Sequence, residues 1–192
     1  MDAVNATNLK YLIETASNRV RDLVTQAEYG ITRIKWKTVS FTIPIKPEPS
    51  HRPRLSGYRV YVPGAAKNQS FFDKNVRPKL GGLFITTPCK VIARVYCETP
   101  KSFTHTQKIL AEMGLLRPWV NTGDVDNFLK SILDQMQPNE KRGHVGIMSN
   151  DCLVIDNVTN LYYSITPRYE ITISYMSNVP DQLKKLMRLE NS

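Results

Sequence analysis

Two aspartates separated by a single residue are the first candidates for metal chemistry in this chain. Asp124 and Asp126 flank Val125, directly before an apolar helical pattern. Side chains two residues apart in extended backbone point the same way, so both carboxylates can face one cation. A hard divalent ion such as Mg²⁺ takes a few carboxylates together with waters and phosphate oxygens. An aspartate at a helix start also serves as a simple cap, and this alternative stays open.

Lys130 and Asp151 extend this group of candidates. Lys130 follows Asp126 by four residues, which places it one helical turn later on the same face. There its ammonium can neutralise charge that develops on a phosphate, or position an attacking water. Asp151 comes just before the apolar run 153–155 and can complete a metal site from the start of a strand. Asp134 is interpreted as a surface or local-pairing residue.

A second candidate group is basic and lies in a proline-rich stretch. Residues 43–54 hold four prolines, and a stiff backbone loses little entropy when its basic side chains meet a phosphate. The residues predicted to contact phosphates are Lys46, Arg52, Arg54 and Arg59.

The net charge of +9 is concentrated in the same part of the chain. Residues 37–101 contain twelve Lys or Arg and three Asp or Glu. Such a concentration suits a polyanion, because Lys and Arg contacts to phosphates supply the sequence-independent part of nucleic-acid binding. A basic surface that only keeps the protein soluble is the alternative.

Hydrophobic patterning predicts the elements that must position these groups. Apolar residues at spacings of three and four predict helices, and alternation predicts strands. The predicted helices span residues 7–28, 69–79, 106–116, 126–137 and 181–190. The predicted strands span 37–45, 58–62, 90–98, 153–164 and 168–176, with the last two paired as a hairpin near Pro167. Helices and strands mix without regular βαβ alternation, which indicates an α+β fold.

Composition excludes several classes of protein. Apolar residues make up 41% of the chain, enough for an ordinary core, and no apolar run approaches the roughly 20 residues of a membrane span. The N-terminus shows no signal-peptide pattern. Cys89, Cys97 and Cys152 contain no C-x-x-C pair, so we expect free thiols in a reducing compartment.

Four motifs occur in an order that resembles a known family. They are P-x-P-S-x-R-P-R at 47–54, R-V-Y-V-P at 59–63, D-V-D-N-x-x-K-x-x-x-D at 124–134 and N-D-x-x-V at 150–154. Over roughly residues 39–176 they resemble the RusA family of phage and prophage Holliday-junction resolvases, which are crossover junction endodeoxyribonucleases.

The resemblance implies an α+β homodimer that binds four-way DNA junctions and introduces paired symmetric nicks with Mg²⁺ or Mn²⁺. By position, it implies that Asp124, Asp126 and Asp151 bind the metal and that Lys130 is the essential lysine. In this mechanism we expect Lys46, Arg52, Arg54 and Arg59 to hold the duplex arms through phosphates. A phage or prophage product of this kind would work in the cytoplasm of a bacterial host.

The chain departs from the family pattern in three places. Asn150 stands where family members often have a first aspartate of an Asp-Asp pair. The segment 137–148 is longer than usual. Residues 1–36 form an N-terminal helical extension to a RusA-like domain at 37–192.

Two alternatives to a junction resolvase remain. One is a non-catalytic DNA-binding protein on the same scaffold, although such a protein would have no chemical reason to keep three aspartates and a lysine. The other is a nuclease for flaps, forks or three-way branches.

Overall fold

The computed structural model describes residues 3–31, 34–50, 54–56, 59–61, 65–118, 122–179, 181 and 184. The chain divides into two compact units. One unit comprises Met1–Trp36 with Met176–Asn191, and the other comprises Lys37–Tyr175. The larger unit contains every residue that the sequence singles out for chemistry.

Two helices stand where the sequence predicts one helix over residues 7–28. They are α1 (Ala3–Thr15) and α2 (Asn18–Ile31), and they are separated by a bend. The Arg21 guanidinium donates to the Ile13 and Glu14 carbonyl oxygens at 3.2 and 2.7 Å, which satisfies carbonyls that the end of α1 leaves open. None of the helices in the described residues is long and apolar enough to cross a membrane.

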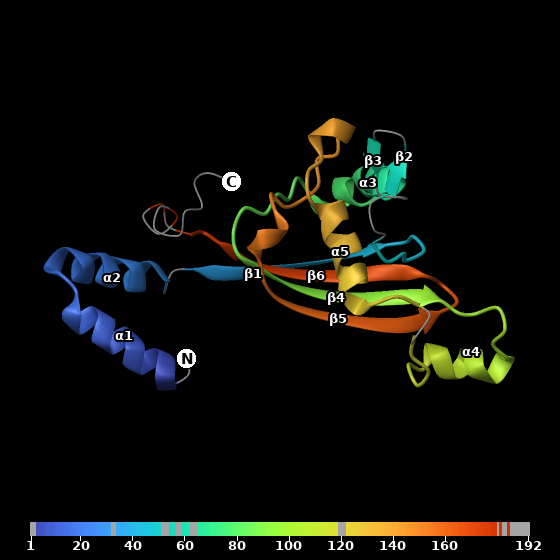
Figure 1. Cartoon of the computed structure of the whole chain (residues 1–192), viewed down its shortest axis with the longest axis horizontal. Coiled ribbons are helices and arrows are strands. Elements are labelled where there is room, and N and C mark those ends of the chain that lie inside the picture. Colours follow the sequence, from blue (N-terminus) through green and yellow to red (C-terminus); the bar gives the residue numbers. More distant parts are fainter. Residues whose placement is uncertain are drawn as a thin grey trace. The chain divides into compact units, whose positions relative to one another are not determined.

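A four-stranded mixed sheet forms the centre of the larger unit (Figure 1). Its strands are β1 (Lys35–Ile43), β4 (Cys89–Glu98), β5 (Val154–Ser164) and β6 (Arg168–Ser177), in the order β1-β6-β4-β5. β4 pairs in parallel with β5 and antiparallel with β6. The α+β fold with a mixed sheet is therefore confirmed.

The predicted hairpin of the last two strands is wrong, because β4 lies between them. Neighbouring strands are about 4.8 Å apart, so a connection from β5 to β6 must cross roughly 10 Å. The linker Ile165–Pro167 can span this distance when extended. β4 takes the central place because Val91, Ala93 and Val95 along one of its faces are fully buried.

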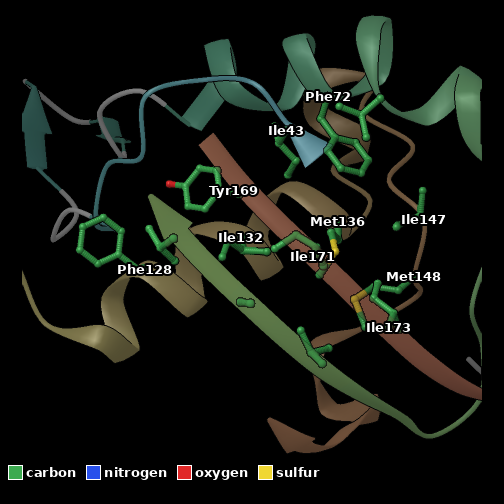
Figure 2. Close-up of a cluster of buried hydrophobic side chains, with 14 of the residues drawn as sticks. Ile43, Phe72, Phe128, Ile132, Met136, Ile147, Met148, Tyr169, Ile171 and Ile173 are labelled. Atoms are coloured by element: carbon green, nitrogen blue, oxygen red, sulfur yellow. The ribbon is translucent and has the colours of Figure 1, made fainter. Parts of the chain in front are cut away.

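Two helices cover one face of the sheet and enclose the core (Figure 2). They are α3 (Ala65–Asn75) and α5 (Val125–Met136). The core joins their apolar faces to inward side chains of β1, β4 and β6. Its largest fully buried members include Tyr169, Phe72, Phe128, Ile132, Met136, Ile171 and Ile173. This packing fixes α5, and with it Asp124 and Asp126, two of the three aspartates predicted to bind metal.

Shorter elements surround this core. The strand predicted at 58–62 is β3 (Arg59–Tyr61), and it pairs antiparallel with β2 (Arg54–Ser56), which the sequence did not predict. α4 (His105–Glu112) begins at a capping box made by Thr104 and Gln107. Three 3₁₀ turns, η1 (Arg77–Leu80), η2 (Glu140–Arg142) and η3 (Asp151–Leu153), complete the connections. The predicted helix at 181–190 lies mostly outside the described residues.

Candidate active site

Helix α5 separates its apolar residues from its charged ones. Phe128, Ile132 and Met136, spaced by four residues, are buried in the core. Asp126, Lys130 and Asp134 are also spaced by four, so they share another face of the helix. We call these three residues the α5 charged stripe. The core packing therefore turns the stripe away from the sheet.

Asp124 occupies the N-cap position of α5 but does not cap the helix. Its backbone is extended and its side chain makes no capping hydrogen bond. Asp126 lies in the first helical turn, and both side chains are exposed. The helix dipole favours negative charge at this end. Since capping does not occupy the Asp124 carboxylate, its oxygens remain available to a cation.

The proline-rich segment packs against this same end of α5. The Ser50 N–H donates to the Asn127 carbonyl oxygen at 2.9 Å. The Tyr169 hydroxyl accepts from the Glu48 N–H at 3.0 Å. Two motifs that lie more than seventy residues apart in the sequence are thus joined beside Asp124 and Asp126.

Gly123 allows this close approach. Its φ is +107°, and a Cβ at this position would lie 3.0 Å from Pro49 Cγ and 3.1 Å from Pro49 Cβ. We expect Gly123→Ala to lower the free energy of unfolding by about 1–2 kcal/mol, because a side chain strains this backbone conformation. The same change should weaken DNA binding by moving the proline-rich segment, as measured by urea unfolding and by DNA affinity.

Gly81→Ala is the matched control for this prediction. Gly81 also has a positive φ, of 59°, but a Cβ there meets nothing within 4 Å. Gly81→Ala should lower the free energy of unfolding by a similar amount and leave DNA affinity unchanged. Equal DNA affinity in the two variants would show that Gly123 does not position the segment.

Of the four basic residues predicted to bind DNA, Lys46 is the one whose side chain the structure describes. Its Nζ lies 2.5 Å from Glu98 Oε2. This hydrogen-bonded ion pair raises the pKa of Lys46 and lowers the pKa of Glu98. Both side chains are exposed, so the pair is weak and Lys46 can exchange Glu98 for a phosphate.

The other three residues of that prediction are only partly described. Arg54 belongs to β2 and Arg59 belongs to β3, but the structure does not describe their side chains. Arg52 lies wholly outside them. Their contacts with DNA stay predictions.

Asp151 is the first residue of η3 and is exposed. The preceding Asn150 caps this turn, because its side-chain oxygen accepts from the Cys152 N–H at 2.8 Å. The asparagine that departs from the family pattern therefore has a structural role here, and it leaves the Asp151 carboxylate facing solvent.

Of the two roles that the sequence predicts for Asp134, the structure favours local pairing over a free surface position. It is half-buried, and burial is the largest cause of its raised pKa. The charge of Lys130 lowers this pKa, and the charge of Asp151 raises it. Asp134 thus lies within electrostatic reach of both residues. The sequence signal for this arrangement is the four-residue spacing of the α5 charged stripe.

The acidic residues are spread along α5 and do not gather around one point. Within the part of the chain that the structure describes, no group of three or more His, Cys, Asp or Glu is close enough to hold a metal ion. Asp134 follows Asp126 by eight residues, or about 12 Å along a helix. The predicted convergence of Asp151 with Asp124 and Asp126 is therefore not seen. Asp151 acts on Asp134 at the other end of the stripe.

Two carboxylates at the helix start nevertheless suit Mg²⁺. This ion is usually held by one or two carboxylates and completes its shell with waters and substrate phosphates. Asp124 and Asp126 offer this donor chemistry from an exposed position. The DNA phosphate would then supply the oxygens that a third protein carboxylate would otherwise provide.

The raised pKa of Asp134 predicts a stabilising substitution. A carboxyl whose pKa is higher in the folded than in the unfolded chain costs stability once the pH exceeds the folded value. We expect Asp134→Asn to raise the melting temperature at pH 8, with a gain that shrinks as the pH falls toward about 4, the ordinary range for aspartate. Calorimetry across this pH range tests the prediction, and a lower melting temperature at pH 8 would contradict it.

Comparisons with known proteins agree with the motif pattern. The model of the family described as "Endodeoxyribonuclease RusA" matches residues 44–174. The "Uncharacterized protein YqaN" of Bacillus subtilis (strain 168) is 31% identical over 150 residues, which cover 72% of this chain and 97% of that protein. The matched family region contains the proline-rich segment, α5 and Asp151.

Proposed function

Because this chain belongs to the RusA family of endodeoxyribonucleases, we propose that it is a metal-dependent nuclease that cuts branched DNA, with four-way junctions as its preferred substrate. The observation that carries the proposal is the exposed pair Asp124 and Asp126 at the start of α5, with Lys130 one turn further on. The basic proline-rich segment packs directly against this end of the helix. The proposed cation ligands and charge stabiliser would then lie beside the segment that we propose binds the DNA backbone.

Asp124 and Asp126 would hold Mg²⁺ or Mn²⁺, and Asp151 would face the metal-bound phosphate from the other end of the α5 charged stripe. When bound, such an ion polarises the scissile phosphate and lowers the pKa of a water for in-line attack. The family's activity as an endodeoxyribonuclease supports this chemistry, and the carboxylate donors suit it.

The side chains of the chain have separate tasks in this mechanism. Lys130 places a positive charge beside the phosphate and stabilises the negative charge that grows on it during attack. Asp134 follows Lys130 by four residues along the stripe, and its negative charge would attract the Lys130 ammonium. Asp151 approaches from η3 at the other end of the stripe, so the scissile phosphate would lie over the middle of α5.

Binding of the DNA arms would use phosphate contacts outside the reacting site. We assign these contacts to Lys46, Arg52, Arg54 and Arg59, in the basic part of the chain. A homodimer would carry two sites related by a twofold axis, which matches the pseudo-twofold symmetry of a four-way junction and explains paired nicks.

One observation favours a second candidate function. The described carboxylates do not form a complete metal site, as expected for a DNA-binding protein that has lost catalysis. The two candidates differ in one respect: the nuclease uses the Asp124 and Asp126 carboxylates to hold a metal ion on a bound phosphate, and the non-catalytic protein does not.

A cleavage assay on labelled DNA tests the proposal. The purified chain is incubated with an immobile four-way junction, a three-way branch, a flap and a linear duplex, each with Mg²⁺ or with EDTA. We expect Mg²⁺-dependent paired nicks at symmetric positions in the four-way junction and little cleavage of linear duplex. Binding without a nick in any substrate would favour the non-catalytic protein, and stronger cleavage of flaps would reassign the substrate.

A further inference from the structure

The segment between α5 and η3 is held firmly, although it contains little regular structure. Residues 137–150 follow the last turn of α5 and lead into Asp151. The Met136 carbonyl oxygen accepts from the Ile147 N–H at 2.7 Å, and the Ser149 N–H donates to the Ile85 carbonyl oxygen at 2.9 Å. The backbone just before Asp151 is therefore hydrogen-bonded to the end of α5 and to the buried Ile85.

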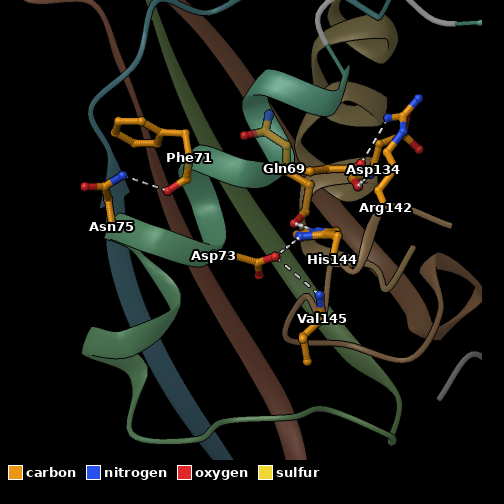
Figure 3. Close-up of polar contacts among 9 residues, drawn as sticks. Gln69, Phe71, Asp73, Asn75, Asp134, Arg142, His144 and Val145 are labelled. Carbon is orange, nitrogen blue, oxygen red and sulfur yellow. Dashed lines mark hydrogen bonds and ion pairs between the residues drawn. The ribbon is translucent and has the colours of Figure 1, made fainter. Parts of the chain in front are cut away.

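A buried histidine anchors the middle of this segment (Figure 3). The His144 side chain is 2% exposed, and its Nδ1 lies 2.7 Å from Asp73 Oδ2. Its Nε2 lies 2.8 Å from the Gln135 carbonyl oxygen. A carbonyl oxygen only accepts, so Nε2 carries a hydrogen, and one proton is shared between Nδ1 and the Asp73 carboxylate. The ring also packs edge-on against Phe72.

Helix α3 makes further contacts with both α5 and the segment 137–150. The Val145 N–H donates to Asp73 Oδ2 at 3.4 Å, so Asp73 binds both side chain and backbone of the segment. The Gln69 amide donates to the Asp134 carbonyl oxygen at 3.0 Å and accepts from Arg142 at 3.0 Å. One turn of α3 thus holds both the last turns of α5 and the segment that follows it.

We propose that Asp73 and His144 are positioning residues of the nuclease, because their bridge holds the segment 137–150 so that Asp151 stays beside Asp134 and Lys130. This inference rests on the proposed function of Asp151 in cleavage. Neither residue needs to touch DNA. Their effect on the reaction passes through the placement of Asp151.

Two substitutions of Asp73 test the bridge. Asp73→Ala removes the partner of His144 Nδ1, and kcat for junction cleavage should fall roughly 10- to 100-fold, since small displacements of catalytic groups are this costly. KM and the DNA dissociation constant should stay within about twofold, because the phosphate-binding residues are untouched. Asp73→Asn should give an intermediate rate, because the amide atom in place of Oδ2 can either donate to Nδ1 or accept from the Val145 N–H, but cannot do both.

A spin label reports the placement of Asp151 without any cleavage. Cys152 is exposed and adjoins Asp151. Cys89 and Cys97 are buried, and burial raises the pKa of each thiol to about 11, so a thiol-specific nitroxide will label Cys152. Asp73→Ala should increase the mobility of this label, and Asp73→Asn should increase it less, because it keeps one of the two contacts of Asp73 Oδ2.

Thr104→Ala is the matched control, because it removes the cap of α4 and leaves the bridge intact. It should change neither kcat nor the label mobility. If Asp73→Ala does not fold, His144→Gln replaces it, since glutamine reaches only one of the two partners. Unchanged kcat and label mobility in the bridge variant would overturn the inference while the nuclease stands. A wild-type chain that never cuts DNA would overturn the proposed function, and the label would still show whether the bridge places Asp151.

Discussion

Asp126→Asn should abolish most DNA cleavage while junction binding persists. Asparagine keeps the size of the side chain and removes the charge that attracts a divalent cation. A bound cation contributes several kcal/mol of charge stabilisation in the transition state, so we expect the cleavage rate to fall by about 10³-fold. Because Asp126 is exposed, the melting temperature should change little. Single-turnover cleavage and a gel-shift titration measure the two effects separately.

Asp156→Asn provides the comparison for this result. Asp156 is an exposed aspartate of β5 whose ion pair with Lys90 lies apart from the α5 charged stripe. Its loss should leave cleavage near the wild-type rate. Equal rates in the two variants would remove Asp126 from the mechanism.

Lys130→Gln should reduce cleavage by about 100-fold, the second-largest effect that we expect. The ammonium lies one turn from Asp126 and is the described cation whose charge acts on Asp134. Its loss removes charge stabilisation from the transition state, as with other preorganised donors. DNA affinity should fall only slightly, because one phosphate contact is a small part of a basic surface. Pre-steady-state kinetics separates the chemical step from binding.

Lys141→Gln controls for the general loss of positive charge. Lys141 is exposed in η2 and is not part of the α5 charged stripe. It should affect binding at low salt and leave the chemical step unchanged. A Lys130 variant with the same profile would reassign Lys130 to phosphate binding alone.

The parts of this structure that local patterns control were accessible from the sequence. The apolar spacing of Leu129, Ile132 and Leu133, with Phe128, predicted α5, and the four-residue spacing placed Lys130 on the face of Asp126. Alternation predicted β4 and β1 within about two residues. The order of motifs also indicated the family, since the spacings of proline, arginine and aspartate carry information without tertiary structure.

The parts that depend on long-range contacts were not accessible. No local sequence pattern shows that β4 lies between β5 and β6. This order follows from the burial of β4 in the centre of the sheet. The separation of Asp151 from Asp124 and Asp126 depends on where the segment 137–150 places Asp151. That placement follows from hydrogen bonds between His144 and Asp73, residues 71 positions apart. Likewise, only the fold shows that Gly123 packs against Pro49.

Manganese binding measured by electron paramagnetic resonance tests the central claim most directly. The chain is titrated with Mn²⁺ in the presence of an uncleavable four-way junction, and the Mn²⁺ bound by the junction alone is subtracted. We expect extra bound Mn²⁺ in the wild-type complex and its loss when Asp124 and Asp126 are both replaced by asparagine. Equal Mn²⁺ binding by the two complexes would contradict this expectation.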